Sequence, residues 1–274
     1  MHISGLALVA ALGARAAEPP DVAQIMARVG VNQQQARDAR ASYVYRQEQW
    51  LRMRRSNGKL AREERREYLV VAAAGSSEKR LTQFAGRYQA KGRYASYDQP
   101  GYHGKGADID GDLIQGMAED MMNDRKSRDG IGHDLFPLTT AEQSKYDFRL
   151  VGTEIYCGRP AYRVAFWPRP DVRDDDQASW KGEALIDAEE FQPVSIETSL
   201  AEEVPLLIKV LLGTDIKGLG FSVTYQRFQD GVRFPAGYGG EFEVRGLFFY
   251  RRTISVSMRN TDFRKTDVNS MAVY

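Results

Sequence analysis

The second half of the chain alternates apolar and polar side chains with a period of two, which constrains the fold more than any other feature. The alternation recurs in successive segments between residues 161 and 263. Because neighbouring side chains of a β-strand point to opposite faces, it indicates an antiparallel sheet solvated on one side. The apolar positions assigned to the inward, concave face are Tyr162, Val164, Phe166, Val194, Ile196, Phe221, Val223, Tyr225, Phe242, Val244, Ile254, Val256 and Met258.

Further strands are expected in the first half, where β-rich stretches at 43–55 and 62–74 flank an Asn57-Gly58 dipeptide. Asn-Gly is a strong signal for a tight hairpin turn. Short links between the strands favour a meander, and about ten strands in one sheet curl strongly or close into a barrel. We therefore predict an α+β fold built on a strongly curved antiparallel sheet, a half-open β-barrel of about ten strands.

Two segments have the spacing of amphipathic helices. Val22, Ile25, Met26 and Val29 recur at i, i+3, i+4 and i+7, and a second stripe runs through residues 109–121. We expect these helices to cover the concave side of the sheet.

The segment 204–212 is almost entirely apolar and lies between two alternating stretches. It suits either a buried strand or a short helix that fills or closes the concave face, since periodicity alone does not separate the two. We favour a helical lid whose apolar side consists of Leu207, Ile208 and Leu211.

Composition and motifs argue against catalysis and cofactors. One cysteine and three histidines leave little for a zinc cluster or a histidine base. The chain has no G-x-S-x-G, P-loop or dinucleotide fingerprint. Asp108, Asp110, Asp112 and Glu119 are spaced like calcium ligands, but the turn glycine of such a loop is missing from its sixth position. We therefore predict a non-enzyme with no catalytic residues, no metal site and no cofactor.

The first hairpin is basic, with eight Lys or Arg against three Glu between residues 46 and 66. The whole chain is nearly neutral, with 38 basic and 37 acidic residues. Nucleic acid is therefore not an expected partner, and we interpret the hairpin as a solvated edge kept soluble by its charge.

The N-terminus has features of an export signal. Residues 3–12 form a short apolar run, and small residues at 14–17 offer a cleavage site. No apolar run approaches the roughly 20 residues that a membrane-spanning helix needs. We predict a signal peptide at 1–17, a single domain at 18–274, and a soluble protein exported to the periplasm.

Turn motifs of the second half resemble those of a known family. They are Gly158-Arg159-Pro160-Ala161-Tyr162, Leu185-Ile186-Asp187, Gln192-Pro193-Val194 and Asp230-Gly231-Val232-Arg233-Phe234-Pro235. This series resembles the outer-membrane lipoprotein-sorting (LolA/LolB/RseB-like) family. The resemblance implies a half-open barrel with helices over its apolar concave side, where the best-known members carry lipoprotein acyl chains.

Together these observations predict a periplasmic carrier that holds an apolar ligand, a lipid or a lipoprotein acyl chain, in the concave face. The alternative is a non-catalytic sensor or scaffold that binds an exported polypeptide by an edge strand or a groove. Peripheral contact with a membrane fits either interpretation.

Overall fold

The computed structural model describes residues 20–73, 76–120, 138–172, 180–201, 214–228, 231–246 and 250–266. The helices are α1 (Val22–Arg40), α2 (Ile109–Asp120) and α3 (Thr140–Gln143), with a 3₁₀ turn η1 (Pro170–Val172). The strands are β1 (Tyr43–Arg55), β2 (Leu60–Ala73), β3 (Ser76–Ala90), β4 (Arg93–Tyr97), β5 (Tyr146–Tyr156), β6 (Arg159–Pro168), β7 (Trp180–Asp187), β8 (Pro193–Leu200), β9 (Thr214–Lys217), β10 (Gly220–Arg227), β11 (Arg233–Gly246) and β12 (Tyr250–Lys265).

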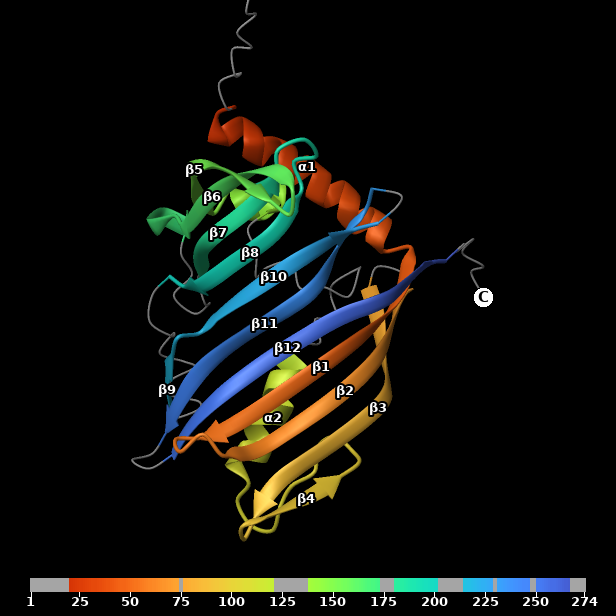
Figure 1. Ribbon diagram of the computed structural model, residues 1–274, viewed down its shortest axis with the longest axis vertical. Coiled ribbons are helices and arrows are strands. Elements are labelled where there is room, and N and C mark those ends of the chain that lie inside the picture. The colour runs from red at the N-terminus through yellow and green to blue at the C-terminus, as the bar shows by residue number, and fades with distance from the viewer. Residues whose placement is uncertain are drawn as a thin grey trace, which may run out of the picture.

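The twelve strands form one open sheet in the order β4-β3-β2-β1-β12-β11-β10-β8-β7-β6-β5, with β9 paired to β11 (Figure 1). The strand pairs of the sheet are antiparallel, including the β1–β12 pair that joins the two halves of the chain. The expected antiparallel sheet is confirmed. It has two strands more than the expected ten or so, because β4 and β9 are short segments without clear alternation.

Tight turns of the expected kind set the register of the hairpins. Gly58 has a positive φ of 77° in the β1–β2 turn, and the side chain of Asn57 accepts the N–H of Lys59 at 3.1 Å. In the β5–β6 turn both Cys157 and Gly158 have positive φ, as a two-residue turn of the primed type requires.

Helices α1 and α2 pack on the same face of the sheet, which we call the inner face, and the opposite side is the outer face. Ile25 and Val29 of α1 lie in one buried cluster, and Ile114 and Ala118 of α2 lie in another. Tyr238 of β11 packs against both clusters, so the two helices share one face. In Figure 1, α1 lies beside the β5–β8 end and α2 lies behind β12 and β1.

The interpretation of the first hairpin as a solvated edge is wrong. β1 lies in the middle of the sheet, between β2 and β12, and the edges are β4 and β5. Arg62 is only 1% exposed and Arg66 only 4%. Every second charged residue of β2 therefore faces the inner side of the sheet rather than water.

Candidate ligand-binding face

Most of the apolar residues assigned to the concave face lie on the inner face. The cluster beneath α1 contains Val164, Phe166, Ile196 and Val223, with Tyr162 and Tyr225 packed against it. The cluster beneath α2 contains Phe242, Val244, Ile254 and Val256, with Met258 packed against it. The structure thus brings the predicted residues together in two groups, one at each end of the face.

The two groups meet at β10 and β11. Phe221 is buried here, and its ring stacks on that of Tyr238 with centroids 5.2 Å apart. The Trp180 ring also packs against Phe221, with centroids 5.4 Å apart. The junction is therefore a row of large rings that continues the apolar wall from one cluster to the next.

The hydroxyl of Tyr238 is the polar exception in this wall. It is buried and has no hydrogen-bond partner among the residues that the structure describes. Burial raises the pKa of Tyr238 above its usual value, so this group is a neutral donor and acceptor at physiological pH. A buried hydroxyl left unpaired costs about 1–3 kcal/mol. A polar atom brought by a ligand would supply the missing hydrogen bond.

Val194 departs from its expected position, and the expected lid is not described. The register of β7 and β8 shifts between the Leu185–Ser195 and Ile186–Pro193 pairs, which leaves Val194 unpaired at a bulge. It is only partly buried and belongs to neither cluster. Leu207, Ile208 and Leu211 lie outside the described residues, so the lid stays a prediction.

A chain of buried amides borders the apolar wall on the side of β1. Gln49 Nε2 donates to Gln47 Oε1 at 3.0 Å, and Gln47 Nε2 donates to Asn260 Oδ1 at 3.2 Å. Asn260 Nδ2 in turn donates to the carbonyl oxygen of Pro235 at 2.8 Å. These hydrogen bonds link β1 to β12 and β12 to β11.

Next to these amides, buried charged side chains of β2 connect the sheet to the start of α2. Arg62 donates from Nη1 to Asp108 Oδ2 at 2.6 Å and from Nε to the hydroxyl of Tyr97 at 2.7 Å. Tyr97 donates to Glu64 Oε1 at 2.7 Å, and Glu64 also pairs with Arg66 at 2.5 Å. Buried charges need such partners, and here two guanidiniums face two carboxylates.

The carboxylates with calcium-like spacing are engaged by other groups. Asp108 accepts from the N–H of Gly111 at 3.0 Å, as a residue capping the start of α2 does, and it also pairs with Arg62. Asp110 pairs with Arg252 at 2.8 Å. The described residues contain no group of three or more His, Cys, Asp or Glu side chains placed to hold a metal ion.

The residues that sequence reasoning missed are the buried polar ones, above all Arg62, Glu64 and Arg66. A signal was available, because a turn at residues 56–59 pairs Met53 with Arg62 and Leu51 with Glu64, as observed. Residues paired in this way share a face, so the apolar residues of β1 already placed these charges inside.

No protein-family model matches the sequence, and no curated protein matches it. Among solved structures, a DUF1329 family protein from Desulfovibrio piger is 12% identical over 90% of this chain and 94% of that one, with a TM-score of 0.37. A LolA superfamily protein from Nitrosomonas europaea is 12% identical over 90% and 94%, with a TM-score of 0.35. The lipoprotein LppX of Mycobacterium tuberculosis is 7% identical over 89% and 96%, with a TM-score of 0.29. Identities this low set no ligand for this chain, so its function is inferred from its own geometry.

Proposed function

We propose that this protein is a non-catalytic carrier that binds an apolar ligand, a lipid or the acyl chain of a lipoprotein, against its inner face. The observation that carries the proposal is the junction at Tyr238, where the described part of the apolar wall contains a buried hydroxyl without a hydrogen-bond partner. Hydrocarbon binds to such a wall because both surfaces leave water. The hydroxyl offers a single directed contact to an ester or carboxyl oxygen, in keeping with ligand sites that combine apolar walls with few polar groups.

The predicted face residues take two roles in this proposal. Those that are only partly buried near the junction, such as Tyr225 and Met258, contact the ligand. Those that are fully buried beneath a helix, such as Phe166 and Ile254, hold the ends of the face in shape. The carrier is proposed to act in the periplasm as one domain, residues 18–274, after removal of residues 1–17. Within the described ranges no helix is both long and apolar enough to cross a membrane.

Titration with a fluorescent fatty acid tests the proposal. The wild-type protein should bind the probe saturably, and Tyr238→Phe should weaken binding about three- to tenfold. The variant keeps the ring but loses one hydrogen bond, which contributes about 0.5–1.5 kcal/mol. Tyr94→Phe is the matched control, because Tyr94 lies in the edge strand β4 and is 52% exposed. Failure of the wild-type protein to bind the probe would refute the carrier proposal.

A second candidate, a scaffold for an exported polypeptide, is favoured by one observation at the sheet edge. β5 is an edge strand of the described sheet, and it carries exposed apolar side chains at Val151 (48%) and Ile155 (71%). Trp167, on the neighbouring strand, is 38% exposed. An unprotected edge with apolar side chains is a template for an added strand.

Hydrogen exchange with an added peptide tests the scaffold. A peptide that alternates Val and Thr should slow exchange of the outward N–H groups of β5, and Ile155→Lys should abolish this protection. Exchange that is the same with and without the peptide would count against the scaffold.

A further inference from the structure

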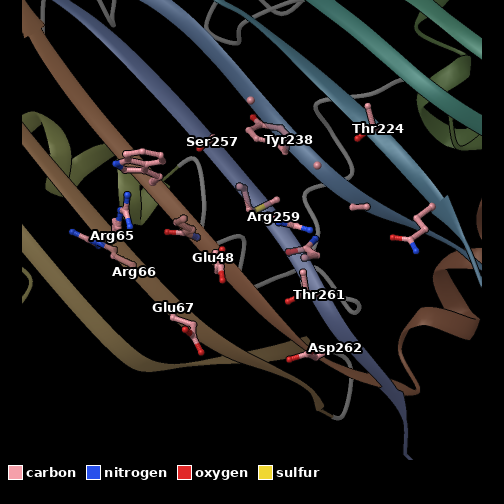
Figure 2. A pocket seen from close by; sticks show the side chains of 18 of the residues that line it. Glu48, Arg65, Arg66, Glu67, Thr224, Tyr238, Ser257, Arg259, Thr261 and Asp262 are labelled. Carbon is pink, nitrogen blue, oxygen red and sulfur yellow. The ribbon is translucent and has the colours of Figure 1, made fainter.

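A groove of about 1420 Å³ lies on the outer face, opposite both helices (Figure 2). Strand register places it there. Leu51 pairs with Val256 and belongs to the cluster beneath α2. Its neighbour Trp50 pairs with Ser257 and Arg65, so these three side chains point the other way. Figure 2 shows residues that line the groove on β1, β2, β10, β11 and β12. The side chains of Tyr238 and Arg66 belong to the inner face, since Tyr238 packs against both buried clusters and Arg66 pairs with the buried Glu64.

The groove exists because its floor lacks large side chains. Ser257 pairs with Gly239, and Gly239 pairs with Ser222, so three adjacent strands carry only small residues along one row. In the next row Gly237 lies between Arg259 and Thr224. Larger side chains on β1 and β2 then form a wall beside this low floor.

A second hollow of about 710 Å³ continues the groove toward the edge of the sheet. The two share Arg65, Phe84 and Ala85 as lining residues, so together they form one trough from β10 to β4. Six spacings between strands of about 4.8 Å give this trough a length of about 29 Å. A shape this long suits a chain-like ligand.

Polar groups at the centre of the trough lack partners within the described structure. Glu48 lies opposite Arg259 in the register, yet neither makes an ion pair or a side-chain hydrogen bond. Arg65 only stacks, with its Cζ 4.2 Å from the centre of the Trp50 ring, and its N–H donors are unused. Arg52 covers the same ring at 3.9 Å and helps to fix it as a wall.

The charge of the lining is balanced. On the outer face the main groove has three carboxylates, Glu48, Glu67 and Asp262, and two guanidiniums, Arg65 and Arg259. Arg46 beside the groove supplies a third positive charge, since it pairs with Glu67 at 2.8 Å and with Asp262 at 3.3 Å. A polyanion such as nucleic acid needs an excess of positive charge, which is missing here.

We propose that the trough binds a neutral oligosaccharide chain. The N–H and C=O groups of its floor are committed to the sheet ladder, so an extended peptide could not pair with them as it does at a free edge. Recognition is left to side chains, and planar guanidinium, carboxylate and amide groups can each form two hydrogen bonds with adjacent hydroxyls. Arg65, Arg259, Glu48 and Gln83 supply such groups along the trough.

Calorimetric titration with neutral tetrasaccharides tests the proposal; the probes are chitotetraose, cellotetraose and maltotetraose. At least one should bind saturably. Ser257→Tyr places a ring on the floor and should weaken binding at least tenfold, while Arg259→Ala should weaken it about three- to tenfold. Thr253→Tyr is the matched control, since Thr253 lies on the same face of β12 outside the groove, and it should bind as the wild-type protein does.

Fatty-acid uptake and peptide binding separate a failure of the oligosaccharide proposal from a failure of the carrier proposal. Fatty-acid uptake should be unchanged in Ser257→Tyr, because the two sites lie on opposite faces; the trough and the carrier can therefore fail separately. Absence of binding by all three sugars at millimolar concentration would overturn the proposal. So would saturable binding of a peptide of mixed charge, blocked by Ser257→Tyr, when no sugar binds.

Discussion

Single aromatic residues of the inner face should contribute strongly to stability. Phe166 and Phe221 are 1% and 3% exposed, so replacing either with Ala should lower the free energy of unfolding by about 3–5 kcal/mol. Trp167→Ala, next to Phe166 but partly exposed, should have a much smaller effect. Denaturant unfolding of the three variants measures these differences. Equal, small losses in all three would show that the two Phe rings are not packed in a core.

At the same scale, period-two alternation predicted burial well where every second residue is apolar. It placed eight of its thirteen residues within the two buried clusters. It failed at Val194, because a bulge inserts one residue and reverses the side-chain direction beyond it. The unpaired hydroxyl of Tyr238 could not be predicted, since its isolation depends on neighbours that are distant in the chain.

Among the elements, α2 depends on the buried pair between Arg62 and Asp108. Asp108→Asn leaves the Arg62 guanidinium, 1% exposed, without this carboxylate, and breaking such a pair costs about 3–5 kcal/mol. Asp112→Asn, on the exposed side of the same helix, is the matched control. Thermal melts should show a large fall in Tm for the first variant and almost none for the second. Equal melting temperatures would mean that α2 is held by its apolar contacts alone.

The same carboxylate should make stability depend on pH. Burial disfavours the charged form of Asp108, but hydrogen bonds from Gly104, Arg62 and Gly111 outweigh it and lower its pKa below the ordinary 3.8. The unfolded state therefore binds a proton first as pH falls. The stabilisation is complete above the unfolded pKa and is lost as pH drops through the lower folded pKa. Between pH 5 and 2, Asp108→Asn should show a shallower loss of stability than the wild-type protein. Parallel curves would contradict this.

Long-range pairing explains why the β1–β2 hairpin was wrongly predicted to be a solvated edge. The β1–β2 hairpin was predicted with its turn and its bounds nearly correct. Its place in the centre of the sheet comes from β12, whose residues lie about 200 positions later in the chain. Charge along β1 and β2 suggested a solvated edge, whereas the pairing with β12 buries one side of both strands. Local patterns carry no information about such a partner.

For the whole molecule, export is the prediction most readily checked. Residues 1–17 are expected to be removed, so the mature protein should begin within a few residues of Ala16. Leu8→Arg, which places a charge in the apolar run, should prevent processing. N-terminal sequencing of protein from the periplasmic fraction provides the measurement. A protein that still begins at Met1 in that fraction would refute a cleaved signal.

The overall architecture was predicted at the level of class. An open antiparallel sheet with a leading helix and one inserted helix is observed. The two separate surfaces, an apolar inner face and a polar outer trough, were not both expected. Alternation shows that a sheet has two kinds of face, but a groove on the polar one depends on small residues aligned across strands, as at Ser222, Gly239 and Ser257.

The most direct test of the central claim is mass spectrometry of the protein purified from cells without detergent. The carrier proposal predicts a bound acyl-containing species in the organic extract at a stoichiometry near one per chain. It also predicts that Met258→Lys, which puts a charge on the apolar wall near Tyr238, lowers this stoichiometry severalfold. A wild-type protein that folds, yields a lipid-free extract and takes up no fatty acid afterwards would contradict the account.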